Sequence, residues 1–567
     1  MKSVLVRLKP YKVEIFFLLL ALLPHLVISL SNPNTILDWY SSDDGFYYFQ
    51  LARNLATGQG FTFDRLNPTN GFHPLWLFLI TPLFAFAQLN LLLPLRLLVI
   101  LSALLSAGTA ILLYRIVSRY TSTEIAALVG LLWIILPRIH VITLHAGVEA
   151  GLNAFCILLF WYALVAFSPS SDRQMILRKL AGMGFLGTLA ILARLDNVFL
   201  VAFGGLWLWL RLWQPPKEKI KRRANPWAWR LTVALAFFAP LALFMLLYLV
   251  WNQLAFGTST PVSGQIKVWW GTLRNTVYGF PVRHASAFFG QFVTDDPELG
   301  PWSLFTAPLY AAAEWLLAVF GQGVTLAARR IVLLASGAML AILFSAVIFK
   351  QSQFFNKSVR GIGLLPFFLG CLAQIIYYKL SGSVAQQPWY WVAEMLFLLF
   401  ALSLLLEALV LWAEDNWPKT VRRWVPKVSL ALIAVLSFAF LNYIHSAIRA
   451  PGDGSSHYYL HRSAWLAAHT EQGARIAITG AGNLAYFIQG RTIVNMDGLM
   501  NSYDYFLALK EGKAAQFLAD LGVDYIFGNE YILTETNPYA PMLAGHLAPF
   551  AVYVFADNEL PLWRFVP

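Results

Sequence analysis

Two adjacent aspartates, Asp43 and Asp44, follow the first long apolar run of the chain, in the stretch SSDDGFYYFQLARNLATGQG. Charged residues make up only 12% of the 567 residues, so two acids beside an apolar run need an explanation. Neighbouring carboxylates repel, and the lower dielectric of a membrane surface strengthens that repulsion. Such a pair can supply a base together with a ligand for a metal or hydroxyl. One helix N-cap and one solvated acid explain the same residues, so both interpretations stay open.

The loop that holds the pair continues with GQGFTFDRLNPTNGFHPLW, in which three glycines and two prolines indicate a shaped backbone. Asn70 and His73 come just before the next apolar run, which begins at Leu75. A lone histidine near a membrane surface is more often a structural hydrogen bonder. Because His73 shares a loop with the aspartates, we carry it and Asn70 as candidate site residues, with Tyr47 of the helix expected over 46–56.

Further charges lie in apolar surroundings, where they are rare and costly and each is a candidate for a site. His145 and Glu149 are four residues apart and share a face if that segment is helical, although a cap or local ion pair explains them too. Arg194 and Asp196 lie between two short apolar runs and form either a local salt bridge or a contact to a phosphate or sugar hydroxyl. Lys267, in FGTSTPVSGQIKVWW, can meet a phosphate as a point charge.

The composition is that of a membrane protein. Hydrophobic residues make up 58% of the chain, and its mean hydropathy is +0.61. Charged residues make up 12%, whereas they make up about a quarter of soluble domains. The net charge of +12 is concentrated in short loops, such as 217–223 and 419–427, which predicts cytoplasmic anchors against anionic lipid and no nucleic acid partner. The two cysteines, Cys156 and Cys371, form neither a disulfide framework nor a metal-binding spacing.

The apolar runs predict a mainly α, polytopic membrane protein of about eleven to thirteen spans, with a cytoplasmic N-terminus. The candidate spans are roughly 13–30, 96–117, 124–142, 150–167, 181–195, 197–213, 231–254, 303–320, 331–349, 360–379, 388–412 and 428–448. The run 76–93 contains Pro82 and ends at Pro94, and we expect a re-entrant or juxtamembrane segment or a short span there.

We predict a transmembrane domain over 1–449, with a first outer loop at 31–75, and an extracytoplasmic domain over 450–567. In the tail, ARIAIT, RTIVNM and VDYIFG read as short strands that alternate with helical segments, so this domain is small and α/β. Its GAGN does not complete a dinucleotide fingerprint. Asp497 and Asn501 either bind acceptor sugar or cap helices.

The stretch SSDDGFYYFQLARNLATGQGFTF, followed by NPTNGFHPLW, resembles the first extracytoplasmic loop of membrane glycosyltransferases of the GT-C fold. That class includes protein mannosyltransferases, the aminoarabinose transferase of lipid A and arabinofuranosyltransferases. The resemblance implies transfer of a sugar from a polyprenyl-phosphate carrier to an acceptor hydroxyl, with inversion, on the outer face of a bacterial or archaeal cell membrane. The acceptor is a glycan, a lipid or a protein.

The resemblance also implies roles for residues. An aspartate of the first loop is the general base, and Asp43 and Asp44 both stay candidates. A divalent cation, Mg²⁺ or Mn²⁺, is compatible with that pair, although many members of the class do without one. The candidate substrate-binding residues are Tyr47, Asn70, His73, His145, Glu149, Arg194, Asp196 and Lys267.

Two other functions are consistent with the composition. A transporter or flippase of lipid-linked sugars explains the helices and buried charges but needs no polar loop with an acidic pair. A non-catalytic cell-envelope assembly protein explains the tail but not the pair.

Overall fold

The structure is a computed structural model that describes residues 11–169, 172–214, 225–281, 300–319, 345, 349–556 and 558–567. Within these residues, seven helices are long and apolar enough to cross a membrane. They are α2 (Lys12–Leu30), α6 (Leu92–Val117), α10 (Arg173–Ala193), α12 (Pro226–Phe256), α17 (Leu364–Ser381), α18 (Val392–Asn416) with the turn before it, and α19 (Pro418–Ser446). The chain is therefore a mainly helical, polytopic membrane protein.

An eighth span is present if α7 (Thr123–Ile135) and the helical segment Pro137–His145 count as one helix bent by 52°. The expected number was eleven to thirteen. Part of the difference arises because the runs at 150–167 and 197–213 form α9 (Ala150–Ala166) and α11 (Val198–Arg211), with 17 and 14 residues. A helix needs about 20 residues to cross the hydrocarbon core. Most of the predicted span 331–349 lies outside the described residues.

The run 76–93 does not form one long helix. It begins with α5 (Pro74–Phe84) and η2 (Ala85–Gln88), and α6 begins only at Leu92. Pro82 lies inside α5, which has 11 residues. This short apolar helix agrees with the expectation of a segment that does not cross in the ordinary way.

The shorter helical elements position the loops. In the membrane domain they are α3 (Pro33–Trp39), α4 (Asp43–Ala56), α8 (Pro137–His140), η3 (Val141–His145), η4 (Leu195–Asn197), α13 (Val262–Trp270), α14 (Ser303–Val319), α16 (Ser352–Ile362) and η6 (Pro388–Trp391). In the tail they are α20 (Tyr458–His469), α21 (Gly482–Phe487), α22 (Tyr503–Lys510), α23 (Ala514–Asp520), α24 (Glu530–Glu535) and α25 (Tyr539–Leu543).

The tail forms a sheet with strand order β2-β1-β3-β5-β4. The strands are β1 (Arg475–Ile478), β2 (Thr492–Asn495), β3 (Tyr525–Phe527), β4 (Leu547–Phe555) and β5 (Asn558–Phe565). The three predicted strands are β1, β2 and β3, and they pair in parallel. The sequence analysis did not identify the antiparallel β4–β5 hairpin, which adds to β3.

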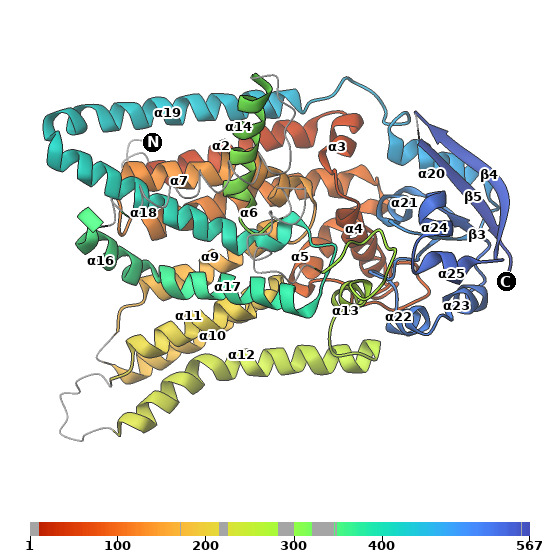
Figure 1. Ribbon diagram of the computed structural model, residues 1–567, viewed down its shortest axis with the longest axis horizontal. Helices are drawn as coiled ribbons and strands as arrows, with labels where there is room; N and C mark the ends of the chain where they lie inside the picture. The colour runs from red at the N-terminus through yellow and green to blue at the C-terminus, as the bar shows by residue number, and fades with distance from the viewer. Residues whose placement is uncertain are drawn as a thin grey trace.

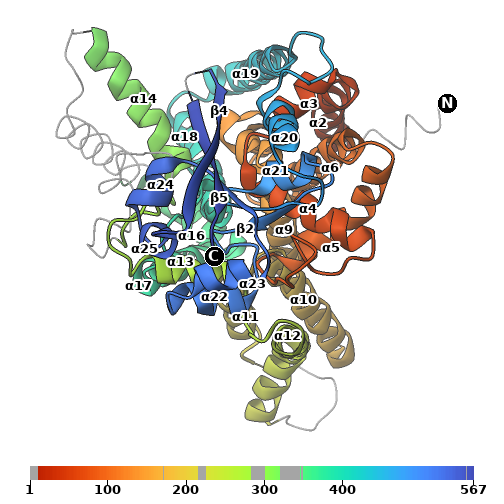
Figure 2. The ribbon, with the colours of Figure 1, turned by 90° about the vertical axis from the view of Figure 1, so that its right-hand side faces the viewer.

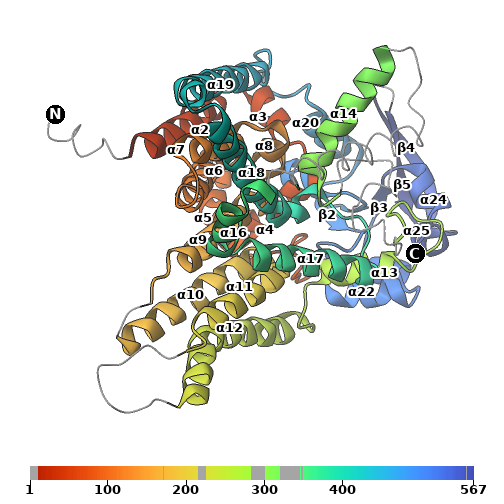
Figure 3. The same cartoon turned by 60° about the vertical axis from the view of Figure 1, so that its left-hand side comes forward.

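The tail caps one end of the helical bundle (Figure 1). Viewed onto that end, α4 and α21 lie side by side in front of the bundle (Figure 2). A third view places α13 beside α22 (Figure 3). Val262, Ile266 and Trp270 of α13 are buried in the same apolar cluster as Tyr505 and other tail residues. The first loop, α13 and the tail therefore share one side of the membrane domain.

Two glycines allow the backbones of the first loop and the tail to touch. A Cβ atom on Gly71 would overlap the carbonyl oxygen of Leu499, and one on Gly482 would overlap the carbonyl oxygen of Asp43. Only a residue without a side chain permits such approach. These contacts hold the tail against the first loop.

We expect Gly71→Ala to destabilise the protein by about 1–3 kcal/mol, as overpacking does in other cores. The measurement is thermal unfolding in detergent, with limited proteolysis of the tail. Gly182→Ala is the matched control, because its Cβ would meet nothing within 4 Å in α10. Equal melting temperatures for Gly71→Ala and the wild type would contradict the close docking.

Candidate active site

The Asp43 carboxylate is bound by the tail. Its Oδ2 accepts a hydrogen bond from Gly482 N at 2.9 Å, and its Oδ1 accepts from Asn483 N at 2.7 Å and Asn483 Nδ2 at 2.6 Å. The amide of Asn483 is oriented in turn by Arg462. A carboxylate at a helix N-terminus is stabilised by these donors and by the helix dipole. Asp43 is therefore a positioning residue that joins α4 to α21.

Neither aspartate is the N-cap of α4, which the sequence analysis had considered. Ser42 is the N-cap, and its hydroxyl accepts from the backbone N–H of Asp44. Both aspartates lie in the first turn of the helix. Capping therefore does not account for either acid, and both carboxylates lie near the positive end of the dipole of α4.

Asp44 has a different environment. Among the described residues, no hydrogen bond to its carboxylate is formed. Burial raises the pKa of Asp44 from 3.8 to about 6. The positive charge of Lys267 lowers this pKa, whereas the negative charges of Asp43, Asp497 and Glu149 raise it further. This carboxyl group thus keeps both oxygens available and titrates near neutral pH.

Tyr47 and Asp497 support the pair from the tail. The Tyr47 hydroxyl donates to Asp497 Oδ2 at 2.8 Å and accepts from Ala481 N and Asn495 Nδ2, each at 3.2 Å. Gly480 N donates to the same oxygen of Asp497 at 3.2 Å. The GAGN segment therefore supplies backbone amides to Asp43, Tyr47 and Asp497. The Tyr47 hydroxyl, which we expected to meet substrate, is engaged by protein groups.

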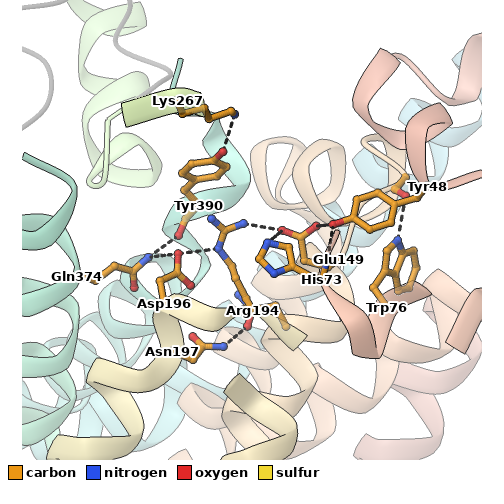
Figure 4. Close-up of polar contacts among 12 residues, drawn as sticks. Tyr48, His73, Trp76, Glu149, Arg194, Asp196, Asn197, Lys267, Gln374 and Tyr390 are labelled. Carbon is orange, nitrogen blue, oxygen red and sulfur yellow. Dashed lines mark hydrogen bonds and ion pairs between the residues drawn. The ribbon is translucent and has the colours of Figure 1, made fainter. Parts of the chain in front are cut away.

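Arg194 is the centre of a buried ion-pair network (Figure 4). Its Nη1 lies 2.5 Å from Glu149 Oε1 and its Nε lies 2.9 Å from Asp196 Oδ2. The local salt bridge expected at this turn is confirmed, and Glu149 extends it. The guanidinium also stacks 4.1 Å from the ring centre of Tyr390. Since buried charges are stable only when paired, these partners fix one another.

The network continues through two residues that sequence reasoning did not identify. Tyr378 Oη donates to Asp196 Oδ2 at 2.7 Å, and Gln374 Nε2 donates to the Tyr390 carbonyl at 2.9 Å. Gln374 and Tyr378 are four residues apart in an apolar run, and that polar pair at the end of a span was the available signal.

His73 lies at the other end of the network. Its Nε2 is 3.6 Å from Glu149 Oε1, and its backbone N–H donates to Tyr48 Oη, which donates to Glu149 Oε2 at 3.3 Å. Burial lowers the pKa of His73, although Glu149 opposes the shift. The Nδ1 atom is buried and lacks a hydrogen-bond partner among the described residues. It is thus an available polar group beside the charged cluster.

Lys267 closes the site from α13. Its Nζ donates to Tyr390 Oη at 2.7 Å (Figure 4). The same atom donates to the Ala385 carbonyl at 3.2 Å. Burial lowers the pKa of Lys267, but Tyr390 and then Asp44 raise it more, so the net shift is upward. The side chain is therefore a buried cation that faces the charge of Asp44.

Two predicted site residues lie elsewhere. Asn70 is buried and bonds to Asn252 at 2.9 Å and to Val262 N at 3.0 Å, so it fixes the turn between α12 and α13.

His145 does not share a helical face with Glu149, which corrects the expectation. The helix ends at His145, Gly147 has φ of 68°, and α9 begins only at Ala150.

Both oxygens of Asp43 accept hydrogen bonds from the tail. A divalent cation at the aspartate pair stays a prediction. Across the described ranges, no group of three His, Cys, Asp or Glu side chains is placed to hold an ion.

Comparison with solved structures identifies the architecture. The crystal structure of ArnT from Cupriavidus metallidurans bound to undecaprenyl phosphate is similar over 97% of this chain and 98% of that chain, with 13% identity and a TM-score of 0.50. The chain has the GT-C fold. At this identity the likeness defines the fold, and the activity has to be argued from the site.

Two further structures of this fold are similar. Apo ArnT from the same organism has 13% identity and a TM-score of 0.49, over 97% of both chains. The oligosaccharyltransferase of Archaeoglobus fulgidus, in complex with Zn and sulfate, has 12% identity and a TM-score of 0.48 over 96% of this chain and 72% of that chain. Residues 448–561 match a family described as a domain of unknown function (DUF8728). No curated protein sequence matches the chain.

Replacement of each aspartate by asparagine should change the stability of the protein differently. We expect Asp43→Asn to lower the free energy of unfolding by about 1–3 kcal/mol, because an amide replaces an acceptor of three hydrogen bonds. Asp44→Asn should leave the melting temperature unchanged or raise it at pH 7, since it removes a charge that the site disfavours.

The sign follows from the raised pKa of Asp44. Ionisation costs stability as the pH rises from 3.8 through about 6, so the gain in Asp44→Asn should vanish near pH 4. Thermal unfolding of both variants at several pH values checks this. A larger loss in Asp44→Asn than in Asp43→Asn would reverse the assignment.

Proposed function

We propose that this protein is a membrane glycosyltransferase that moves a sugar from a polyprenyl-phosphate carrier to an acceptor hydroxyl, with Asp44 as general base. The observation that carries the proposal is the contrast within the pair. The tail engages Asp43, whereas the carboxylate of Asp44, whose pKa is about 6, accepts no hydrogen bond within the described residues. A general base works best when its pKa is near the working pH.

The proposed reaction is a single displacement with inversion. Asp44 takes the proton of the acceptor hydroxyl as its oxygen bonds to the anomeric carbon. The bond from that carbon to the phosphate oxygen breaks, and the carrier phosphate leaves with the electron pair. A phosphate leaves without strong protonation, so one base is sufficient.

Lys267 is the proposed counter-charge for the carrier phosphate. It is buried, and its charge interacts with that of Asp44. Cationic groups that are already oriented stabilise charge as it develops in the transition state. In this proposal Arg194 acts indirectly, because Glu149, Asp196 and Tyr378 already engage its guanidinium. His73 Nδ1 is the remaining available group and is proposed to contact the donor or acceptor.

The lipid carrier is supported by two features. The site lies where the first loop and the tail meet the helical bundle, whose helices include seven that are long and apolar enough to cross a membrane. The ArnT structure that shares the fold was solved with undecaprenyl phosphate. The basic loops favour a cell membrane location with the N-terminus in the cytoplasm and the tail outside.

Replacement of the base should abolish transfer. We expect Asp44→Asn to reduce kcat by about 10²–10⁴-fold, the usual contribution of a general base. The assay is sugar transfer in membranes at equal protein level, with the donor identified by mass spectrometry of lipid that co-purifies with the protein. Asp504→Asn, an exposed acid of α22, is the matched control. Full transfer by Asp44→Asn would sink the assignment of the base.

The rate should also depend on pH. Asp44 must be ionised to accept a proton, so kcat/KM is expected to fall below pH about 6, where that carboxyl becomes protonated. A pH profile with a fixed donor checks the acid limb. A profile that is flat from pH 5 to pH 8 would count against Asp44.

A further inference from the structure

A polar cavity lies between the first loop and the tail, and Asp44 is not among the residues that line it. Its volume is about 420 Å³. Its walls come from the second half of α4, residues 63–65, the connection 87–91 between α5 and α6, and residues 485–493 of the tail. None of the groups assigned to the reaction above lines it.

Positive charge dominates this cavity. Arg53, Arg65 and Arg491 line it, and Asp64 is its only lining carboxylate. Asp64 is engaged by its own loop, since its oxygens accept from Thr62 and from the backbone and side chain of nearby residues. Among the described residues, no salt bridge to any of the three arginines is formed.

Two of the arginines keep donors free. Among the described residues, Arg53 donates only through Nη1, to the Tyr486 carbonyl at 3.0 Å. Within the same part of the chain, Arg65 is exposed and donates only through Nε, to Asn54 Oδ1 at 3.2 Å. Arg491 is different, because carbonyl, hydroxyl and amide oxygens engage its guanidinium. The free nitrogens of Arg53 and Arg65 therefore remain for a ligand, and Arg491 contributes charge.

The two free arginines form a like-charge pair. Burial lowers the pKa of Arg53, and the charge of Arg65 lowers it further, with Tyr486 acting in the opposite direction. Arg65 also has a left-handed backbone with φ of 65°, which is uncommon for a residue other than glycine or asparagine. An anion between the two guanidinium groups would relieve the repulsion and accept their fork-shaped donors.

The cavity and the proposed base share one helix. Arg53 lies nine residues after Asp44, about two and a half turns along α4, so the two side chains project from opposite faces of the helix. Leu89 lines the cavity and is 78% exposed, and Phe86 beside it is 44% exposed. Exposed apolar side chains next to an apolar helix belong at a membrane surface.

We propose that this cavity binds a phosphate or carboxylate carried by the acceptor, and so selects anionic acceptors. The proposal rests on the proposed function for the identity of the ligand, but the anion site itself does not. The anion belongs either to a lipid headgroup or to an acidic glycan.

Binding can be tested without any transfer. The full chain in phosphatidylcholine nanodiscs is melted with inorganic phosphate or with chloride at equal ionic strength. A bound anion raises the melting temperature as its concentration rises. We expect this rise for the wild type and its loss in the double variant Arg53→Gln/Arg65→Gln. The control is Arg564→Gln, which replaces an exposed arginine on β5 and should keep the rise. Arg65→Gln alone, which removes one hydrogen bond, serves if the double variant is unstable.

The source of the anion is tested by native mass spectrometry. Retention of phosphatidylglycerol over phosphatidylcholine that depends on the two arginines assigns the cavity to a lipid headgroup. A response to inorganic phosphate alone assigns it to a glycan-borne acid. Equal responses of wild type and double variant to both probes overturn the anion site.

Kinetics test the link to the acceptor. We expect the double variant to raise KM for the acceptor by about tenfold or more, since hydrogen bonds to charged groups are strong, with kcat and the KM for the donor unchanged. An unchanged acceptor KM overturns the assignment to the acceptor. If the wild type transfers no sugar but still responds to phosphate, the proposed function fails and the anion site stands.

Discussion

The contact between the Asp43 carboxylate and the first amides of α21 is the constraint on which the site depends. It joins the first loop to a tail more than 400 residues later in the chain, through three hydrogen bonds. The close approach of Gly482 to Asp43 adds a steric condition to the electrostatic one. Asp43 is held by the tail, whereas the carboxylate of Asp44 has no hydrogen bond within the described residues and interacts with the charge of Lys267. Asp43 therefore positions α4, and Asp44 is the base only in the proposed reaction.

A network of buried, paired charges supports the site. Arg194 bridges Glu149 and Asp196, and the whole set is almost fully buried. A buried charge is stable only when it is paired. The bonds of Arg194, which follows α10, to Glu149 before α9 and to Tyr378 of α17 therefore hold these three helices together. These ion pairs fix the side chains around Arg194. The cation Lys267 comes from a separate element, α13, which packs on the tail.

The sequence predicted much of the fold, because apolar length and strand alternation are local properties. The long spans, the three parallel strands and the α/β character of the tail were all readable. The β4–β5 hairpin was missed, and α9 and α11 are shorter than the apolar runs suggested. His145 and Glu149 have helical spacing, but Gly147 breaks the helix between them. A pattern of residue types does not report such a backbone break.

For the site, the sequence by itself determined which residue types were unusual: an acidic pair, a histidine in a shaped loop, and charges within apolar runs. These could be found because charge in a membrane protein is costly wherever it lies. Only the tertiary structure decided which aspartate is free, since the partners of Asp43 are backbone amides of GAGN, and backbone donors have no signature in a sequence. It likewise decided that Arg53 and Arg65 meet Arg491 across a cavity, because that meeting depends on how the tail docks and on nothing local.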